Sequence, residues 1–220
     1  MKDHLHSELK REFQLERMIL FSDAVFAIAI TLLVIELKVP EIPHDLVTED
    51  RLLESLAEQI PKLIGFLISF FIIGLYWTVH HRLFGYVVNY TQRLLWLNLF
   101  FLLAVVLMPF STAFYSQYIY SLSKSPVVLY VFNICFLGIM NFVLWRYISN
   151  PKRELTEGLS RSWAVYYSFR AIMVPILFFI MAILYLFFTK YAIYIPMLTP
   201  IIMFIMARIY KRRNPEFRKK

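Results

Sequence analysis

The chain has 220 residues, of which 60% are hydrophobic and only 17% are charged. A soluble domain of this length would leave too much apolar surface in water, so the composition excludes one and predicts an integral membrane protein. The formal net charge is +8, but the basic residues lie in the tails and at the ends of apolar runs, where membrane orientation explains them better than nucleic-acid binding does.

Six apolar runs follow one another along the chain, and each is long enough to cross a bilayer as a helix. They cover residues 18–37, 61–84, 94–115, 127–147, 163–189 and 191–209. A spanning helix needs roughly 20 mostly apolar residues, so six spans leave only short loops and two tails. The pattern predicts an all-α integral membrane fold, with one six-helix domain over residues 1–220 and short cytoplasmic tails.

Basic residues concentrate on alternate connections between these runs. The two tails and the connections after the second and fourth runs carry most of them: Lys2, Lys10, Arg11, Arg17, Arg82, Arg93, Arg146, Lys152, Arg153, Arg161, Arg208, Lys211, Arg212, Arg213, Arg218, Lys219 and Lys220. Cytoplasmic loops of membrane proteins are enriched in Lys and Arg. We therefore expect a multi-pass protein of the cell membrane with both termini in the cytoplasm.

The first outer connection, residues 40–60, is acidic. It holds six carboxylates against the single Arg51: Glu41, Asp45, Glu49, Asp50, Glu54 and Glu58. The commoner explanation is a solvated amphipathic helix after Pro43. The alternative is an acidic vestibule that raises the local cation concentration by electrostatic focusing.

The segment 17–23, R-M-I-L-F-S-D, places a cation and a carboxylate at the inner end of the first span. A lone carboxylate at mid-membrane costs about 2.5–3.5 kcal/mol and less near the interface, so Asp23 is expected to have a partner. The candidates at similar depth are His80, His81, Asn98 and Arg17. Arg170, inside the fifth span, also needs a partner.

Arg17, Phe21, Ser22 and Asp23 form an R-x-x-x-F-S-D pattern that resembles the signature of the transmembrane protein 175 family of potassium channels. The resemblance continues through 24–35, through 76–81 and from Asn98 to residue 110. It implies a signature and gating network made of Arg17, Phe21, Ser22, Asp23, Trp77, His80, His81 and Asn98. It further implies a homotetramer of the single-repeat prokaryotic type, in which the first helix of each subunit lines a central pore.

The same resemblance places a hydrophobic pore constriction on Ile28, Leu32 and Ile35, and a pore threonine on Thr31. Helical geometry agrees, because at 100° per residue these four and Ala24 fall within about 50° of one direction. Asp23 lies about 140° from Ile28 on this wheel, so a pore-facing Ile28 turns Asp23 into the protein. Without the resemblance, such a stripe would more commonly face lipid or pack in the core.

The expected function is a potassium-permeable cation channel. Four copies of the Ile28 stripe would form an apolar throat that gates by dewetting, and Thr31 hydroxyls would favour potassium, the more easily dehydrated ion. The sequence has no T-V-G-Y-G filter, so we expect modest selectivity for potassium over sodium. Permeant potassium, membrane lipid and further copies of the chain are the expected partners, and no cofactor is expected.

Three other functions compete with the channel. A proton-coupled secondary transporter would use Asp23, His80 and Arg170 as a relay, but such proteins often have repeats that this chain lacks. The second is a membrane-embedded enzyme, for which the Asp, His and Asn side chains at the inner ends of the spans are the candidate site, although they fit a structural network as well. An enzyme is not expected, because hydrolase and nucleotide-binding motifs are absent from the sequence. A metal site is not expected either, because the adjacent His80 and His81 point about 100° apart on a helix. The third competing function is that of a structural protein that conducts no ions.

Overall fold

The computed structural model describes residues 2–118, 121–188 and 199–213. Its elements are the helices α1 (Lys2–Ile35), α2 (Glu49–Glu58), α3 (Ile60–Phe84), α4 (Gln92–Tyr118), α5 (Ser125–Ile148), α6 (Arg161–Phe187) and α8 (Thr199–Arg213), with 3-10 turns at His44–Leu46 and Pro151–Arg153. The described residues contain 5 helices long and apolar enough to cross a membrane, namely Lys10–Ile35 of α1 and all of α3, α4, α5 and α6. The predicted all-helical membrane fold is therefore confirmed.

The first five predicted spans match these five helices to within a few residues at most boundaries. The sixth, 191–209, lies partly outside the described residues, and only its second half corresponds to α8. The charged N-terminal stretch does not form a separate helix. It continues without a break into the first span, which makes α1 a single helix of 34 residues.

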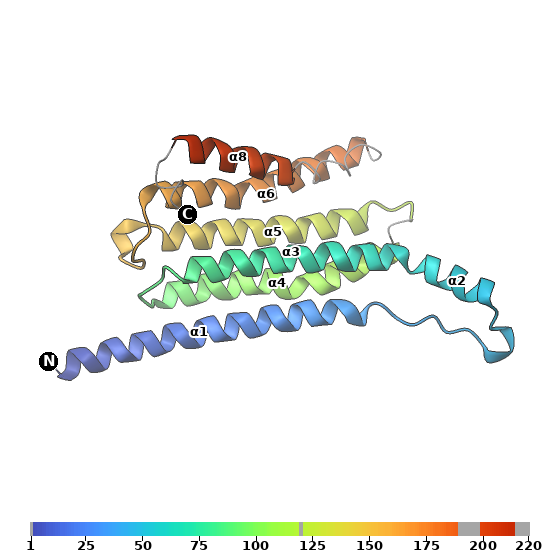
Figure 1. The fold of residues 1–220 in the computed structure, drawn as a ribbon, viewed down its shortest axis with the longest axis horizontal. Coiled ribbons are helices and arrows are strands. Elements are labelled where there is room, and N and C mark those ends of the chain that lie inside the picture. The colour runs from blue at the N-terminus through green and yellow to red at the C-terminus, as the bar shows by residue number, and fades with distance from the viewer. Residues whose placement is uncertain (1, 119–120, 189–198, 214–220) are drawn as a thin grey trace.

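The long helices lie side by side and run back and forth along one axis (Figure 1). α4 packs against α1, α3 and α5, and α6 packs against α5. The α3–α4 and α5–α6 connections meet at the end of the bundle where α1 begins. There the Val88 N–H donates to the Leu155 carbonyl at 2.9 Å, and the Asn89 side chain donates to the Glu154 carbonyl at 2.6 Å. We call this the N-terminal end of the bundle.

α1 binds the bundle through one narrow apolar face. Leu15, Met18, Phe26, Ala29 and Leu33 recur at the three- and four-residue spacings of a single helix face, and all five are buried. They join the large core cluster that α3, α4 and α5 also supply. The opposite side of α1 is consequently left outside this core.

Small and polar side chains hold α3, α4, α5 and α6 together. Inside the bundle the Thr112 hydroxyl lies 2.7 Å from the Ser69 hydroxyl, which lies 2.9 Å from the Tyr130 hydroxyl. Gly138 of α5 faces Pro175 of α6 so closely that an added Cβ would lie 2.7 Å from the proline Cδ. Both features are typical of membrane helix interfaces, where small residues permit close approach and hydrogen bonds join helices.

The predicted helix after Pro43 is also present. α2 has no buried residue, and its Thr48 hydroxyl caps the first turn by accepting from the Arg51 N–H at 3.4 Å. Figure 1 shows α2 beyond the end of the bundle opposite to the N-terminal end. The helix is confirmed, while its solvation and the acidic vestibule stay predictions.

Candidate functional site

The stripe expected to line a pore lies on the outer side of α1. Ile28, Leu32 and Ile35 are 57%, 41% and 63% exposed in the single subunit, and Ala24 and Thr31 are exposed with them. These side chains face away from the surface through which α1 binds α3 and α4. The subunit therefore presents a continuous apolar strip on its longest helix.

Thr31 is the one polar side chain within this strip, and its hydroxyl has a defined orientation. The Thr31 Oγ1 donates its proton to the Ile28 carbonyl at 2.9 Å, one turn back along the helix. A hydroxyl has one donor and two acceptor lone pairs. Because the proton is used by the backbone, the oxygen lone pairs remain available to a cation.

Asp23 has a partner on the neighbouring helix. The Trp77 indole Nε1 of α3 donates to the Asp23 carboxylate at 2.9 Å, and both residues are partly exposed. The expected partners were His80, His81, Asn98 and Arg17, so this pairing corrects the prediction. Trp77 was expected in the network only through the family resemblance, although an indole N–H at a helix interface requires an acceptor and is itself a signal.

Ser22, Asn98 and His80 form a buried hydrogen-bond chain that links α1, α4 and α3. The Asn98 amide nitrogen donates to the Ser22 hydroxyl at 2.8 Å, and the Asn98 carbonyl oxygen lies 2.9 Å from His80 Nε2. Each of the three is at most 1% exposed. Asn98 is the centre of the chain, because only its side chain contacts both other members.

The donor and the acceptor of each hydrogen bond in this chain follow from the Ser22 end. The Ser22 hydroxyl donates to the Met18 carbonyl at 2.8 Å, so towards Asn98 it can only accept. The Asn98 amide must then face Ser22, its carbonyl must face His80, and His80 Nε2 must carry the proton. The Nδ1 of His80 has no hydrogen-bond partner among the described residues.

Aromatic rings fix the His80 imidazole in place. It stacks on Phe101 with centroids 5.5 Å apart and planes at 5°, and on Phe84 with centroids 4.3 Å apart. Phe26 of α1 approaches the same ring at 5.6 Å. The histidine therefore lies at a junction between α1, α3 and α4, and rotation of α1 would disturb its contact with Phe26.

The remaining members of the predicted network lie outside this chain. Phe21 is 52% exposed, and the Arg17 guanidinium lies 5.7 Å from the centre of the Phe13 ring. The His81 ring stands 5.8 Å from the Trp77 ring on the exposed side of α3. The eight residues thus separate into a buried chain, the Asp23–Trp77 pair with His81 beside it, and two outward-facing residues.

Comparison with known proteins identifies relatives of this chain. A family model described as the endosomal/lysosomal potassium channel TMEM175 matches residues 17–109, a segment that begins at Arg17 and ends at Pro109. A potassium channel of Chamaesiphon minutus is 35% identical over 142 residues, which are 64% of this chain and 69% of that protein. A potassium channel of Streptomyces collinus is 37% identical over 114 residues, 52% of this chain and 53% of that one.

A solved structure is similar over nearly the whole chain. It is the crystal structure of a lysosomal potassium-selective channel TMEM175 homolog from Chamaesiphon minutus, with a TM-score of 0.72 and 26% sequence identity. The superposition covers 90% of this chain and 99% of that one. The likeness therefore extends beyond the matched N-terminal segment, into the helices that follow it.

Proposed function

We propose that this chain, which belongs to the family of the endosomal/lysosomal potassium channel TMEM175, forms a potassium-permeable channel. The relatives named above are potassium channels, and the chain shares their fold. The observation that carries the proposal is the division of α1 into two sides. One side is fixed to α3 and α4, and the other is an apolar strip with one threonine.

The outer strip of α1 is the proposed pore wall. Exposed Ile28, Leu32 and Ile35 would meet their copies around a shared axis in a homotetramer and form a throat too apolar to hold a hydrated ion. Such constrictions gate by losing water. Conduction then requires the throat to widen, which needs tilt or rotation of α1.

Thr31 supports modest preference for potassium. Its hydroxyl proton is held by the Ile28 carbonyl, so toward an ion the oxygen acts as an acceptor. Four such oxygens partly replace the water that an ion loses in the throat, and potassium loses that water more easily than sodium does. A strong filter of stacked carbonyl rings is not part of this arrangement, so we expect selectivity well below that of channels with a T-V-G-Y-G loop.

The buried chain Ser22–Asn98–His80 and the Asp23–Trp77 pair are the proposed anchor of the pore helix. They join α1 to α4 and α3 on the side opposite the strip. The basic residues of the α3–α4 and α5–α6 connections lie at this N-terminal end of the bundle. By the positive-inside rule, this end is the proposed cytoplasmic side of a cell membrane.

The test is potassium flux through the purified protein in liposomes. Ile28→Asn places a polar group in the throat, so we expect faster potassium flux and a smaller ratio of potassium to sodium flux. The matched control is Ile183→Asn, at an exposed apolar position of α6. It should leave both quantities as in the unchanged protein. Equal flux and ionic preference in the Ile28 variant would remove this residue from the pore.

The same assay separates a channel from a proton-coupled transporter. A channel conducts in unitary current steps and without a proton gradient. Potassium flux that saturates, depends on a proton gradient and gives no current steps would contradict the proposal.

A further inference from the structure

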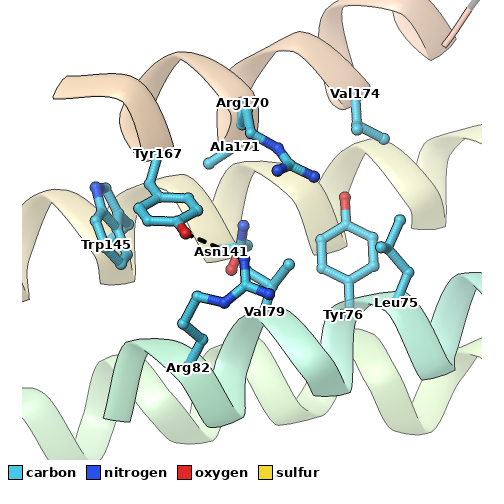
Figure 2. A pocket seen from close by; sticks show the side chains of 10 residues that line it. All are labelled: Leu75, Tyr76, Val79, Arg82, Asn141, Trp145, Tyr167, Arg170, Ala171 and Val174. Atoms are coloured by element: carbon cyan, nitrogen blue, oxygen red, sulfur yellow. Dashed lines mark hydrogen bonds between the residues drawn. The ribbon is translucent and has the colours of Figure 1, made fainter. Parts of the chain in front are cut away.

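A cavity between α3, α5 and α6 receives two arginine side chains from opposite sides (Figure 2). Arg82 comes from the last turn of α3, and Arg170 comes from the interior of α6. Asn141 of α5 lies between them, and Tyr76 points its hydroxyl toward Arg170. This cavity is separate from the outer strip of α1 and from the anchor of the pore helix.

Among the described residues, the hydrogen-bond partners of the two arginines are neutral tyrosine hydroxyls. Arg82 Nη1 donates to the Tyr167 hydroxyl at 3.1 Å, and Arg170 Nη1 donates to the Tyr166 hydroxyl at 3.4 Å. No aspartate or glutamate is among the described residues that line the cavity. Cations within a membrane span are costly unless an opposite charge or water reaches them, and such residues mark functional sites by default.

Two further polar groups in the cavity are buried and unused. The Tyr76 hydroxyl and the Asn141 amide oxygen have no hydrogen-bond partner among the described residues, and the two residues are only 4% and 3% exposed. Buried polar atoms are nearly always paired, so each exception calls for a ligand or a water. The Tyr76 hydroxyl still has its proton to donate.

We propose that this cavity binds a phosphate group, supplied either by an anionic phospholipid or by inorganic phosphate. Two guanidinium groups and a hydroxyl donor approach from different helices, which suits a tetrahedral anion with several oxygens. Arginine forms paired hydrogen bonds with phosphate and is the usual residue for its recognition. The Asn141 side chain adds an amide that can turn its nitrogen toward the anion, since the two ends of an amide are exchangeable.

The rest of the lining favours the lipid as the source. Leu75, Val79, Ala171 and Val174 provide apolar walls beside the charged groups. A lipid would place its phosphate between the arginines and its hydrocarbon along these walls. Basic pockets between membrane helices bind lipid head groups in this way. A free phosphate ion would use the arginines alone and leave the apolar walls without a role.

The binding test uses the full chain in nanodiscs and measures its thermal unfolding. A bound ligand raises the unfolding temperature because it stabilises only the folded state. One arm adds phosphatidylglycerol to a phosphatidylcholine nanodisc, and the other adds inorganic phosphate to a pure phosphatidylcholine nanodisc at constant ionic strength. An upward shift in the first arm alone identifies the lipid, and a shift in both identifies a site open to either source.

Three variants decide whether the shift comes from this cavity. Arg170→Gln should abolish it. Tyr76→Phe removes only the unpaired hydroxyl, so the unfolding temperature without ligand should not fall, while the apparent affinity drops about tenfold. Arg146→Gln is the control, because Arg146 is an exposed arginine in the last turn of α5 that does not line the cavity. It should keep the full shift.

The proposal is overturned by no shift in either arm, or by a shift that Tyr76→Phe leaves unchanged. It is equally overturned if Arg146→Gln loses as much of the shift as Arg170→Gln does. The shift would then come from a general attraction of anions to basic residues and not from this cavity. Should Arg170→Gln not fold, the Tyr76→Phe comparison decides. These measurements report stability rather than ion flux, so their outcome is independent of whether the pore conducts.

Discussion

Single polar side chains determine how α1 is oriented against its neighbours. Asn98 has its amide directed to Ser22 and its carbonyl to His80, and this arrangement exists only because Ser22 has already given its proton to the backbone. Replacement of any member therefore leaves a buried partner unpaired. In a low-dielectric interior that is the expensive outcome.

Asn98→Ala should lower the free energy of unfolding by about 1–3 kcal/mol, because it leaves both Ser22 and His80 without their partner. The measurement is unfolding in mixed micelles with increasing denaturing detergent. Thr78→Ala is the control, since the Thr78 hydroxyl donates to the Leu75 carbonyl of its own helix, and it should change stability by less than about 0.5 kcal/mol. An Asn98→Ala midpoint equal to that of the unchanged protein would contradict the anchor.

The Asp23–Trp77 pair is best tested as a pair. Trp77→Phe removes the indole donor, and Asp23→Ala removes its acceptor. A double-mutant cycle in the same unfolding assay should give a coupling energy of about 0.5–1.5 kcal/mol, because the bond involves a carboxylate but both groups are partly exposed. Additive effects of the two changes would mean that this contact does not hold α1 to α3.

At the scale of elements, the positions of the helices and the two sides of α1 were predictable, and the faces of the other helices were not. Long apolar runs fix the positions of α1, α3, α4, α5 and α6, because length and hydropathy alone identify a span. Which side of each helix contacts which neighbour depends on tertiary packing that no single run encodes. For α1 the heptad-like recurrence from Leu15 to Leu33 separates a buried side from an exposed one.

Some partners in the candidate site could be predicted from the sequence, and others could not. The resemblance placed Ser22, His80 and Asn98 in one network, and the structure joins them by hydrogen bonds, while their part in gating stays a prediction. The partner of Asp23 was missed because similarity of depth alone indicates His80, His81, Asn98 or Arg17 and does not indicate Trp77. Arg82 was used only to predict the orientation of the chain in the membrane. Its position in one cavity with Arg170 was not predicted, because the proximity of residues 88 positions apart depends on the arrangement of three helices.

The α5–α6 interface gives a prediction at this scale. Gly138→Ala would place a methyl group 2.7 Å from Pro175 Cδ, and overpacking of this kind costs about 1–3 kcal/mol. Gly74→Ala is the matched control, because an added Cβ there meets nothing within 4 Å, so it should be neutral or slightly stabilising. Equal unfolding midpoints for the two variants would show that α5 and α6 can separate without cost.

For the whole molecule, α1 has two sides with different roles. Its buried side is fixed by packing and hydrogen bonds, and its exposed side is a strip that a single subunit leaves uncovered. Assembly of four copies around a shared axis, as proposed above, would cover that strip with the strips of the other copies. Membrane lipid would also cover this apolar strip. A measurement of ion flux therefore distinguishes a pore wall from a lipid-facing surface.

The most direct measurement is potassium flux after chemical modification of the strip. Ile35→Cys is made in a Cys135→Ala background, which removes the one native cysteine, and is treated with a membrane-impermeant cationic thiol reagent. The account predicts that flux falls to background, while Ile183→Cys, on the exposed side of α6, retains its flux. Undiminished flux from a fully labelled Ile35→Cys protein would contradict the placement of α1 at the pore.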